Sequence, residues 1–152
     1  MRKFHFKLQP LLNKERIYEN ECIGRLRVIQ DEMLKKEDRL KNLKERKIKC
    51  QNGLKTKKQR HVTSEELKIY EEYFVKLGNE IDTGSLELQE IAKELRTVQE
   101  ELAKIIKKRK ALEKLRERWE EEYRSDWVLS LNKEMDDIAM KKFINKLATN
   151  GS

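Results

Sequence analysis

The residue types that can do chemistry are few and scattered in this sequence. His5 and His61 lie far apart and show no metal-binding spacing. There is no Cys-x-x-Cys pair, no His-Glu-x-x-His motif and no glycine-rich phosphate loop. Paired catalytic carboxylates need a pocket that holds them, and the acidic run at 120–122 is typical of a solvated face. We therefore expect no enzymatic activity, no metal site and no cofactor.

The two cysteines predict no disulfide. Cys22 and Cys50 are 28 residues apart, or ~42 Å along one helix, which no disulfide can bridge. We expect them to be reduced, buried and hydrophobic in character, as in a cytosolic protein. No apolar run exceeds three residues, so we expect neither a signal peptide nor a membrane span.

Basic residues raise the question of an acidic partner. The net charge is +8 and the pI about 9.4, which permits nucleic acid, an acidic membrane surface or an acidic protein. Residues 104–118 hold eight basic and two acidic side chains. These are interleaved with the hydrophobic repeat, whereas a basic zipper carries its basic region as a separate block. We therefore expect a solvated face or an acidic-partner face, and no specific nucleic acid.

The composition indicates which elements position these residues. Charged residues make up 42% of the chain and hydrophobic residues 37%, with five Gly and one Pro. Such a chain is typical of a coiled coil or long helix, with disorder as the competing interpretation. Periodicity decides between the two. Of the 17 positions at every seventh residue from Leu67 to Tyr123 and from Tyr70 to Trp119, 14 are apolar, which predicts a supercoiled helix.

The fold class predicted is all-α, with two long helices in an antiparallel coiled-coil hairpin. Helix 1 is expected at about 10–57, a turn at about 58–63 and helix 2 at about 64–147, all in one domain, 1–152. A capping box of Thr63 and Glu66 marks the start of helix 2. The first repeat is weaker because lysines interrupt it at Lys36, Lys47 and Lys57. Residues 35–60 carry a net +9 and residues 62–87 a net −5, which favours their pairing.

The second helix is predicted to extend beyond the first. Folding about residue 61 places residue i near 122 − i, so residues after about 115 overhang. Phe4 and Phe6 are placed to fold over the start of the overhang but cannot cover the rest. The overhang carries an apolar stripe that includes Met135, Ile138, Met140 and Phe143, and such stripes mark interaction sites. Docking into another protein, self-association and a frayed end are the alternatives.

Two glycines lie within the predicted second helix. Gly78 and Gly84 each cost ~1 kcal/mol relative to Ala, yet the repeat keeps its phase across them. We interpret them as soft points in one helix, with a functional hinge as a hypothesis.

Several segments, in order along the chain, resemble the flagellar export protein FliJ family. They are "FHFKLQPLL" at 4–12, "SEELKIYEEYFVKLGNEI" at 64–81, "KALEKLRERWEEEY" at 110–123 and "EMDDIAMKKF" at 134–143. The resemblance implies a non-enzymatic stalk and coupling component of the flagellar type III export apparatus. It also implies binding to the export ATPase hexamer and to the export gate protein, and escort of export chaperones. The location implied is cytoplasmic, peripheral at the cytoplasmic face of the cell membrane through protein contacts.

Carried over to this sequence, the resemblance assigns two contact surfaces. The export-gate candidates are Tyr73, Leu77 and Glu80. Leu77 is also a heptad core position, so Tyr73, beside the seam, is the better candidate. Gly84 departs from the family pattern, where a larger residue is expected. The ATPase-contact candidates are Trp119, Tyr123, Trp127, Leu131, Met135, Asp136, Asp137 and Ile138.

Two other functions remain open on the sequence alone. One is the rotor stalk of another rotary ATPase, although such subunits normally have a globular portion or a longer chain. The other is a self-assembling structural coiled coil, in which two overhangs would bury each other.

Overall fold

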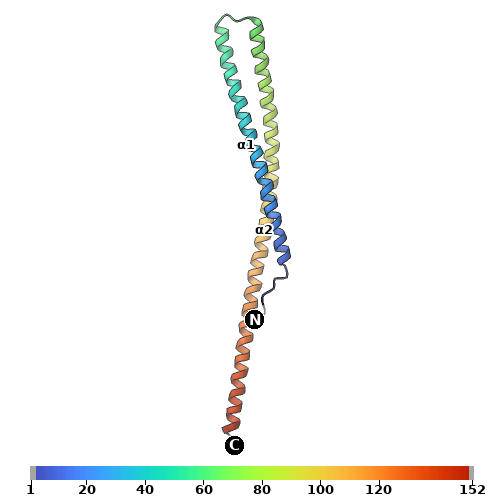
Figure 1. The fold of residues 1–152 in the computed structure, drawn as a ribbon, viewed down its shortest axis with the longest axis vertical. Helices are drawn as coiled ribbons and strands as arrows, with labels where there is room; N and C mark the ends of the chain where they lie inside the picture. Colours follow the sequence, from blue (N-terminus) through green and yellow to red (C-terminus); the bar gives the residue numbers. More distant parts are fainter. Residues whose placement is uncertain (1–2, 151–152) are drawn as a thin grey trace. The chain divides into compact units, whose positions relative to one another are not determined.

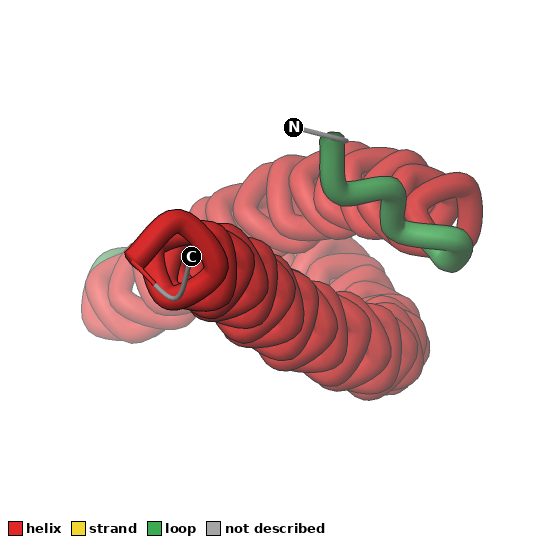
Figure 2. Tube along the Cα trace, turned by 90° about the horizontal axis from the view of Figure 1, so that it is seen from below, coloured by secondary structure: helices red, strands yellow, loops and turns green. Residues whose placement is uncertain are grey.

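The computed structural model describes residues 3–150, which form two long helices. Helix α1 spans Gln9–Gln59 and helix α2 spans Ser64–Asn150. The remaining described residues are a lead-in before Gln9 and a turn between the helices, drawn in green in Figure 2. Both helices begin and end within three residues of the predicted positions. The predicted fold class, an all-α antiparallel hairpin with a longer second helix, is confirmed (Figure 1).

The chain divides into two compact units. One runs from Tyr18 to Lys104, and the other joins the residues up to Ile17 with those from Ile105 onward. Whether the chain folds as one domain stays a prediction.

In the unit from Tyr18 to Lys104, the helices pair in the predicted register. Cys22 Sγ donates to the Val98 carbonyl at 3.7 Å, and Cys50 Sγ donates to the Tyr70 carbonyl at 3.8 Å. Both thiols are free and buried, as predicted. The core of this unit follows the heptad positions of both helices. Its buried members are Cys22, Ile29, Leu40, Leu43, Cys50, Leu77, Ile91 and Val98.

The lysines that interrupt the first repeat each have a partner on α2. Lys36 Nζ lies 3.5 Å from a carboxylate oxygen of Glu87. Lys47 Nζ lies 4.9 Å from the ring centroid of Phe74, and Lys57 Nζ lies 4.3 Å from that of Tyr70. These cation–π contacts let charged heads remain near water while their stems cover apolar surface.

The turn and the start of α2 follow local capping chemistry. The Thr63 hydroxyl accepts a hydrogen bond from the Glu66 amide at 3.4 Å, which satisfies one of the amides that a helix start leaves open. Glu65 and Glu66 add negative charge to the first turn, where the helix dipole favours it.

In the other unit, the lead-in and the first turns of α1 pack against α2. Pro10 lies in the first turn of α1, where its missing amide proton costs nothing. Leu12 is fully buried and Phe6 is 4% exposed, so this small core is as well packed as that of the longer unit. This core belongs to the same unit as the exposed end of α2 and therefore supports the candidate site described below.

Candidate partner-docking site

An aromatic clasp, formed by Phe4, Phe6, Trp119 and Tyr123, joins the lead-in to α2. The Phe6 and Trp119 ring centroids are 5.3 Å apart at an interplanar angle of 69°, an edge-to-face arrangement. The ring centroid of Phe4 lies 5.8 Å from that of Tyr123 and 6.5 Å from that of Phe6. The lead-in therefore covers the beginning of the overhang, as predicted, and partly buries Trp119 and Tyr123.

An ion cluster lies next to the clasp. Arg109 Nη1 donates to both carboxylate oxygens of Glu113, at 3.0 and 3.1 Å, and Arg16 Nη2 lies 3.5 Å from the same carboxylate. The hydrogen bond from Arg109 lowers the pKa of Glu113 below its ordinary value of 4.5, with a smaller contribution from Arg16. Arg109 occupies a heptad position, and this pairing explains how a charged residue is accommodated there.

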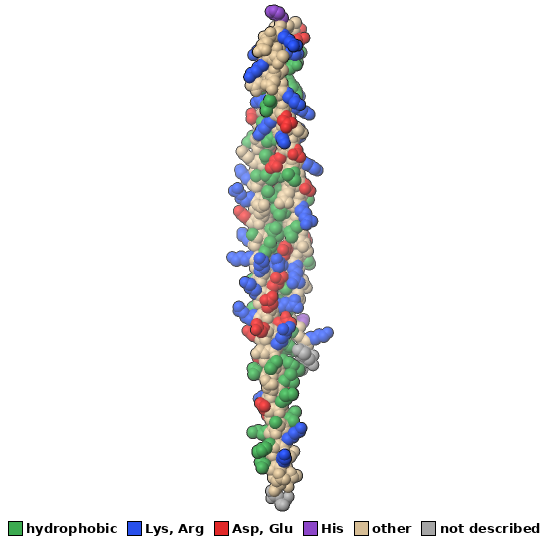
Figure 3. All heavy atoms as spheres, turned by 90° about the vertical axis from the view of Figure 1, so that its left-hand side faces the viewer, with side chains coloured by type: hydrophobic (Ala, Val, Ile, Leu, Met, Phe, Trp, Pro, Cys, Tyr) green, Lys and Arg blue, Asp and Glu red, His purple; other side chains and the backbone are tan. Residues whose placement is uncertain are grey.

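Beyond the clasp, α2 has no packing partner among residues 3–150. Trp127 is partly buried, and every residue from Val128 to Asn150 is exposed. Leu131 is 39% exposed, Met135 67% and Ile138 56%. Asp136 and Asp137, which lie between Met135 and Ile138 in the sequence, are also exposed. Figure 3 shows hydrophobic side chains uncovered along this lower end of the molecule.

The apolar residues of this end occupy two faces of the helix, and the single stripe expected from the sequence is wrong. At 100° per residue, Trp127, Leu131, Met135 and Ile138 fall within an arc of ~80°. Met140, Phe143, Ile144 and Leu147 fall within a second arc of ~100°, whose centre lies ~170° from the first. The second face has the i, i+3, i+4, i+7 spacing that is the usual signal of an amphipathic helix.

The gate-contact candidates lie in the unit from Tyr18 to Lys104. Tyr73 is 43% exposed and Glu80 is exposed, so both are available at the surface. Leu77 is only 2% exposed and packs with Leu43 and Cys50 in the core. The structure therefore brings Tyr73 and Glu80 to the surface and places Leu77 beneath them.

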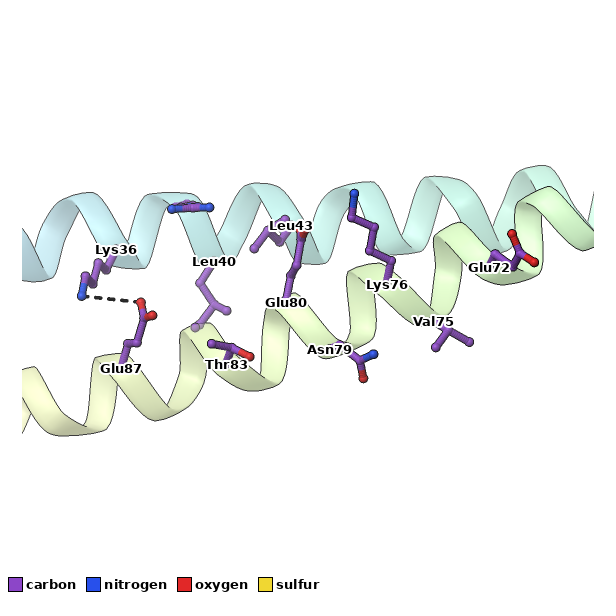
Figure 4. A pocket seen from close by; sticks show the side chains of 12 residues that line it. Lys36, Leu40, Leu43, Glu72, Val75, Lys76, Asn79, Glu80, Thr83 and Glu87 are labelled. Carbon is purple, nitrogen blue, oxygen red and sulfur yellow. Dashed lines mark ion pairs between the residues drawn. The ribbon is translucent and has the colours of Figure 1, made fainter.

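A groove of about 560 Å³ runs between the helices, and Glu80 is one of the residues that line it (Figure 4). Leu40 and Leu43 lie in it with Val75, Glu80 and Gly84, and Lys36 and Glu87 pair across it. A Cβ atom at Gly84 would lie 3.2 Å from Leu40 Cδ1, closer than most such contacts. A larger residue than glycine at this position would therefore have to displace the end of the Leu40 side chain.

Other classes of site give no signal in the described part of the chain. Within residues 3–150, no three His, Cys, Asp or Glu side chains gather as a metal site would require. None of the helices described is long and apolar enough to cross a membrane.

The fold defines the class of protein: an all-α coiled-coil hairpin that carries a single-helix extension with exposed apolar faces. Compared with protein families, residues 4–148 match the model described as "Flagellar FliJ protein". The chain therefore belongs to the FliJ family, and it is a protein related to flagellar export. Searches of curated proteins and of solved structures gave no match.

Proposed function

We propose that this protein is a non-enzymatic stalk and coupling component of the flagellar type III export apparatus. The observation that carries the proposal is the exposed end of α2, in a chain that belongs to the FliJ family. An apolar stripe this long on one helix is costly in water unless a partner covers it.

The partner proposed for this end is the export ATPase hexamer. We define the ATPase stripe as Trp127, Leu131, Met135 and Ile138, with the aromatic clasp at its base. Asp136 and Asp137 lie at the same height on the helix but ~140° and ~120° from the centre of this stripe. The clasp ties α2 to the lead-in at Trp119 and Tyr123, and so anchors the base of the stripe within its own unit. The apolar residues supply affinity, and the two carboxylates supply orientation by pairing with basic groups of the partner.

The second partner proposed is the export gate protein, bound at the surface of Tyr73 and Glu80. Exposed tyrosines are favourable contact residues because they combine a large apolar area with a hydroxyl. Leu77 supports this surface from below. Escort of export chaperones and a peripheral position at the cytoplasmic face of the cell membrane complete the proposal.

The test uses the full chain with three substitutions on the ATPase stripe. Leu131→Ser, Met135→Ser and Ile138→Ser change exposed side chains, so the fold should be retained. We expect the variant to lose sedimentation with the ATPase hexamer and to lose any effect on its hydrolysis rate.

The matched control is Val28→Ser with Leu34→Ser. These residues are 59% and 58% exposed on α1, so the control removes exposed apolar side chains from another part of the chain. The control should bind like the unaltered chain. If the stripe variant also binds the hexamer normally, the proposed ATPase contact is wrong.

A further inference from the structure

The second apolar face of the α2 end belongs to a basic amphipathic segment. We call residues 139–150 the basic end segment. Its apolar residues are well exposed: Met140 65%, Phe143 63%, Ile144 57% and Leu147 57%. It also contains Lys141, Lys142 and Lys146, and no acidic residue. The ATPase stripe does not include any of these side chains.

The lysines of this segment frame its apolar face. On a helix of 100° per residue, Lys141 and Lys146 lie ~110° from the centre of the apolar arc, on opposite sides. Lys142 lies at ~150°, on the polar side. All three are exposed and have no ion-pair partner within residues 3–150. Figure 3 shows Lys or Arg side chains beside hydrophobic ones at this end of α2.

We propose that the basic end segment binds the surface of a lipid bilayer that contains anionic lipids. In this pose the helix lies in the plane of the interface, with Phe143 and Ile144 among the acyl chains. Lys141 and Lys146 reach sideways to the headgroups on both flanks, as long basic side chains do at interfaces. The described helices are too polar to span the bilayer, so the contact is a surface one.

Charge and geometry favour a bilayer over a second copy of the chain. Two basic end segments packed together would bring lysines against lysines with no acidic residue to offset them. The nearest acidic residues, Asp136 and Asp137, precede the segment by about one turn and lie ~30° and ~70° from the centre of its apolar arc. A second helix docked along the whole end could cover only one of two faces that lie ~170° apart. An anionic bilayer supplies negative charge on both sides of the apolar face. Unlike a second helix, it does not have to be aligned residue by residue with the segment.

The experiment is flotation of the full chain with vesicles in the absence of other proteins. Vesicles of phosphatidylcholine alone are compared with vesicles of equal parts phosphatidylcholine and phosphatidylserine. We expect binding to the anionic vesicles only, decreasing as salt is added. Each lysine at an anionic surface is worth about fivefold in binding. Replacing Lys141, Lys142 and Lys146 with Gln should therefore weaken binding about 100-fold, and Phe143→Ser with Ile144→Ser should also weaken it strongly.

A charge-matched control separates this site from general attraction to a basic protein. Lys44→Gln, Lys49→Gln and Lys55→Gln remove the same charge from exposed positions on α1 and should retain most of the binding. The proposal is overturned if this control loses as much binding as the end-segment variant. It is also overturned if Phe143→Ser with Ile144→Ser binds normally, or if the unaltered chain does not bind.

The outcome is independent of the proposed function. The vesicles contain no ATPase, so the ATPase stripe variant should still bind them. If the end-segment variants lose binding to the ATPase hexamer and not to vesicles, the second face belongs to a protein interface and the lipid proposal is wrong.

Discussion

Phe6 meets Trp119 edge-on, with ring centroids 5.3 Å apart, and so ties the lead-in to α2 near the end of its covered part. Packing ends a few residues further on: Tyr123 and Trp127 are still partly buried, whereas every residue from Val128 to Asn150 is exposed. A helix end without tertiary contacts would fray from its base if nothing held it there. The clasp therefore gives the exposed end a fixed point of attachment.

Removing the Phe6 ring tests the clasp. Phe6 is 4% exposed, so Phe6→Ala should lower the free energy of unfolding by ~3–5 kcal/mol. Urea unfolding followed by circular dichroism measures the loss. Leu11→Ala, at a residue 45% exposed, is the control and should change stability little. A loss below ~1 kcal/mol for Phe6→Ala would mean that the lead-in does not stabilise the fold.

The two glycines of α2 should respond differently to the same substitution. Neither described glycine has a positive φ, so alanine fits the backbone at both. At Gly78 a Cβ would meet only the flexible Lys47 Nζ, at 3.6 Å, and Gly78→Ala should stabilise by ~1 kcal/mol. At Gly84 the Cβ meets Leu40 at 3.2 Å, so part of that gain should be lost to displacement of Leu40. The unfolding temperatures of Gly78→Ala and Gly84→Ala measure the difference in stabilisation. Equal stabilisation by both substitutions would contradict the contact between the new Cβ atom at position 84 and Leu40.

The Glu113 cluster predicts a pH dependence of stability. Its folded pKa lies below 4.5, chiefly because of the hydrogen bond from Arg109. The carboxylate therefore stabilises the fold above its ordinary pKa, and this contribution is lost as the pH falls through the folded pKa. Since the pair is partly solvated, Glu113→Gln should cost less than ~1 kcal/mol at pH 7.

The measurement is the difference in unfolding temperature between the unaltered chain and Glu113→Gln. We expect the unaltered chain to have the higher unfolding temperature near neutral pH. We expect this advantage to disappear well below pH 4.5, the ordinary pKa of the Glu113 carboxyl. Glu121→Gln, at an exposed position without such a cluster, should show no difference at either pH. If the difference in unfolding temperature between the unaltered chain and Glu113→Gln instead grows as the pH falls, the ionised Glu113 carboxylate does not stabilise the fold.

The heptad repeat was sufficient to predict the two helices, their register and the burial of Leu77. The register follows because the hydrophobic seam and the opposite charges of residues 35–60 and 62–87 favour the same alignment. The sequence predicts that Phe4 and Phe6 fold over the start of the overhang. It does not predict which rings they contact or at what angle, because residue spacing carries no information on ring geometry.

Two features could not be predicted from the repeat. The approach of Gly84 to Leu40 depends on the local distance between helices, which heptad positions do not specify. The two faces of the α2 end were merged because the repeat stutters after Trp119 and no partner helix fixes its frame. Assigning each residue an angle on the helix separates Met135 from Met140, which lie ~140° apart.

Tyr73 and Leu77 separate binding from stability at the gate-facing surface. Tyr73 is 43% exposed, so Tyr73→Ala should weaken binding of the export gate protein and leave the unfolding temperature nearly unchanged. Leu77 is 2% exposed in the core, so Leu77→Ala should cost ~2–5 kcal/mol of stability. Leu77→Met keeps the volume and should restore most of that stability. Calorimetric titration with the gate protein and thermal unfolding measure the two effects. If Tyr73→Ala binds normally while Leu77→Met loses binding, the contact surface runs through the seam and the assignment to Tyr73 is wrong.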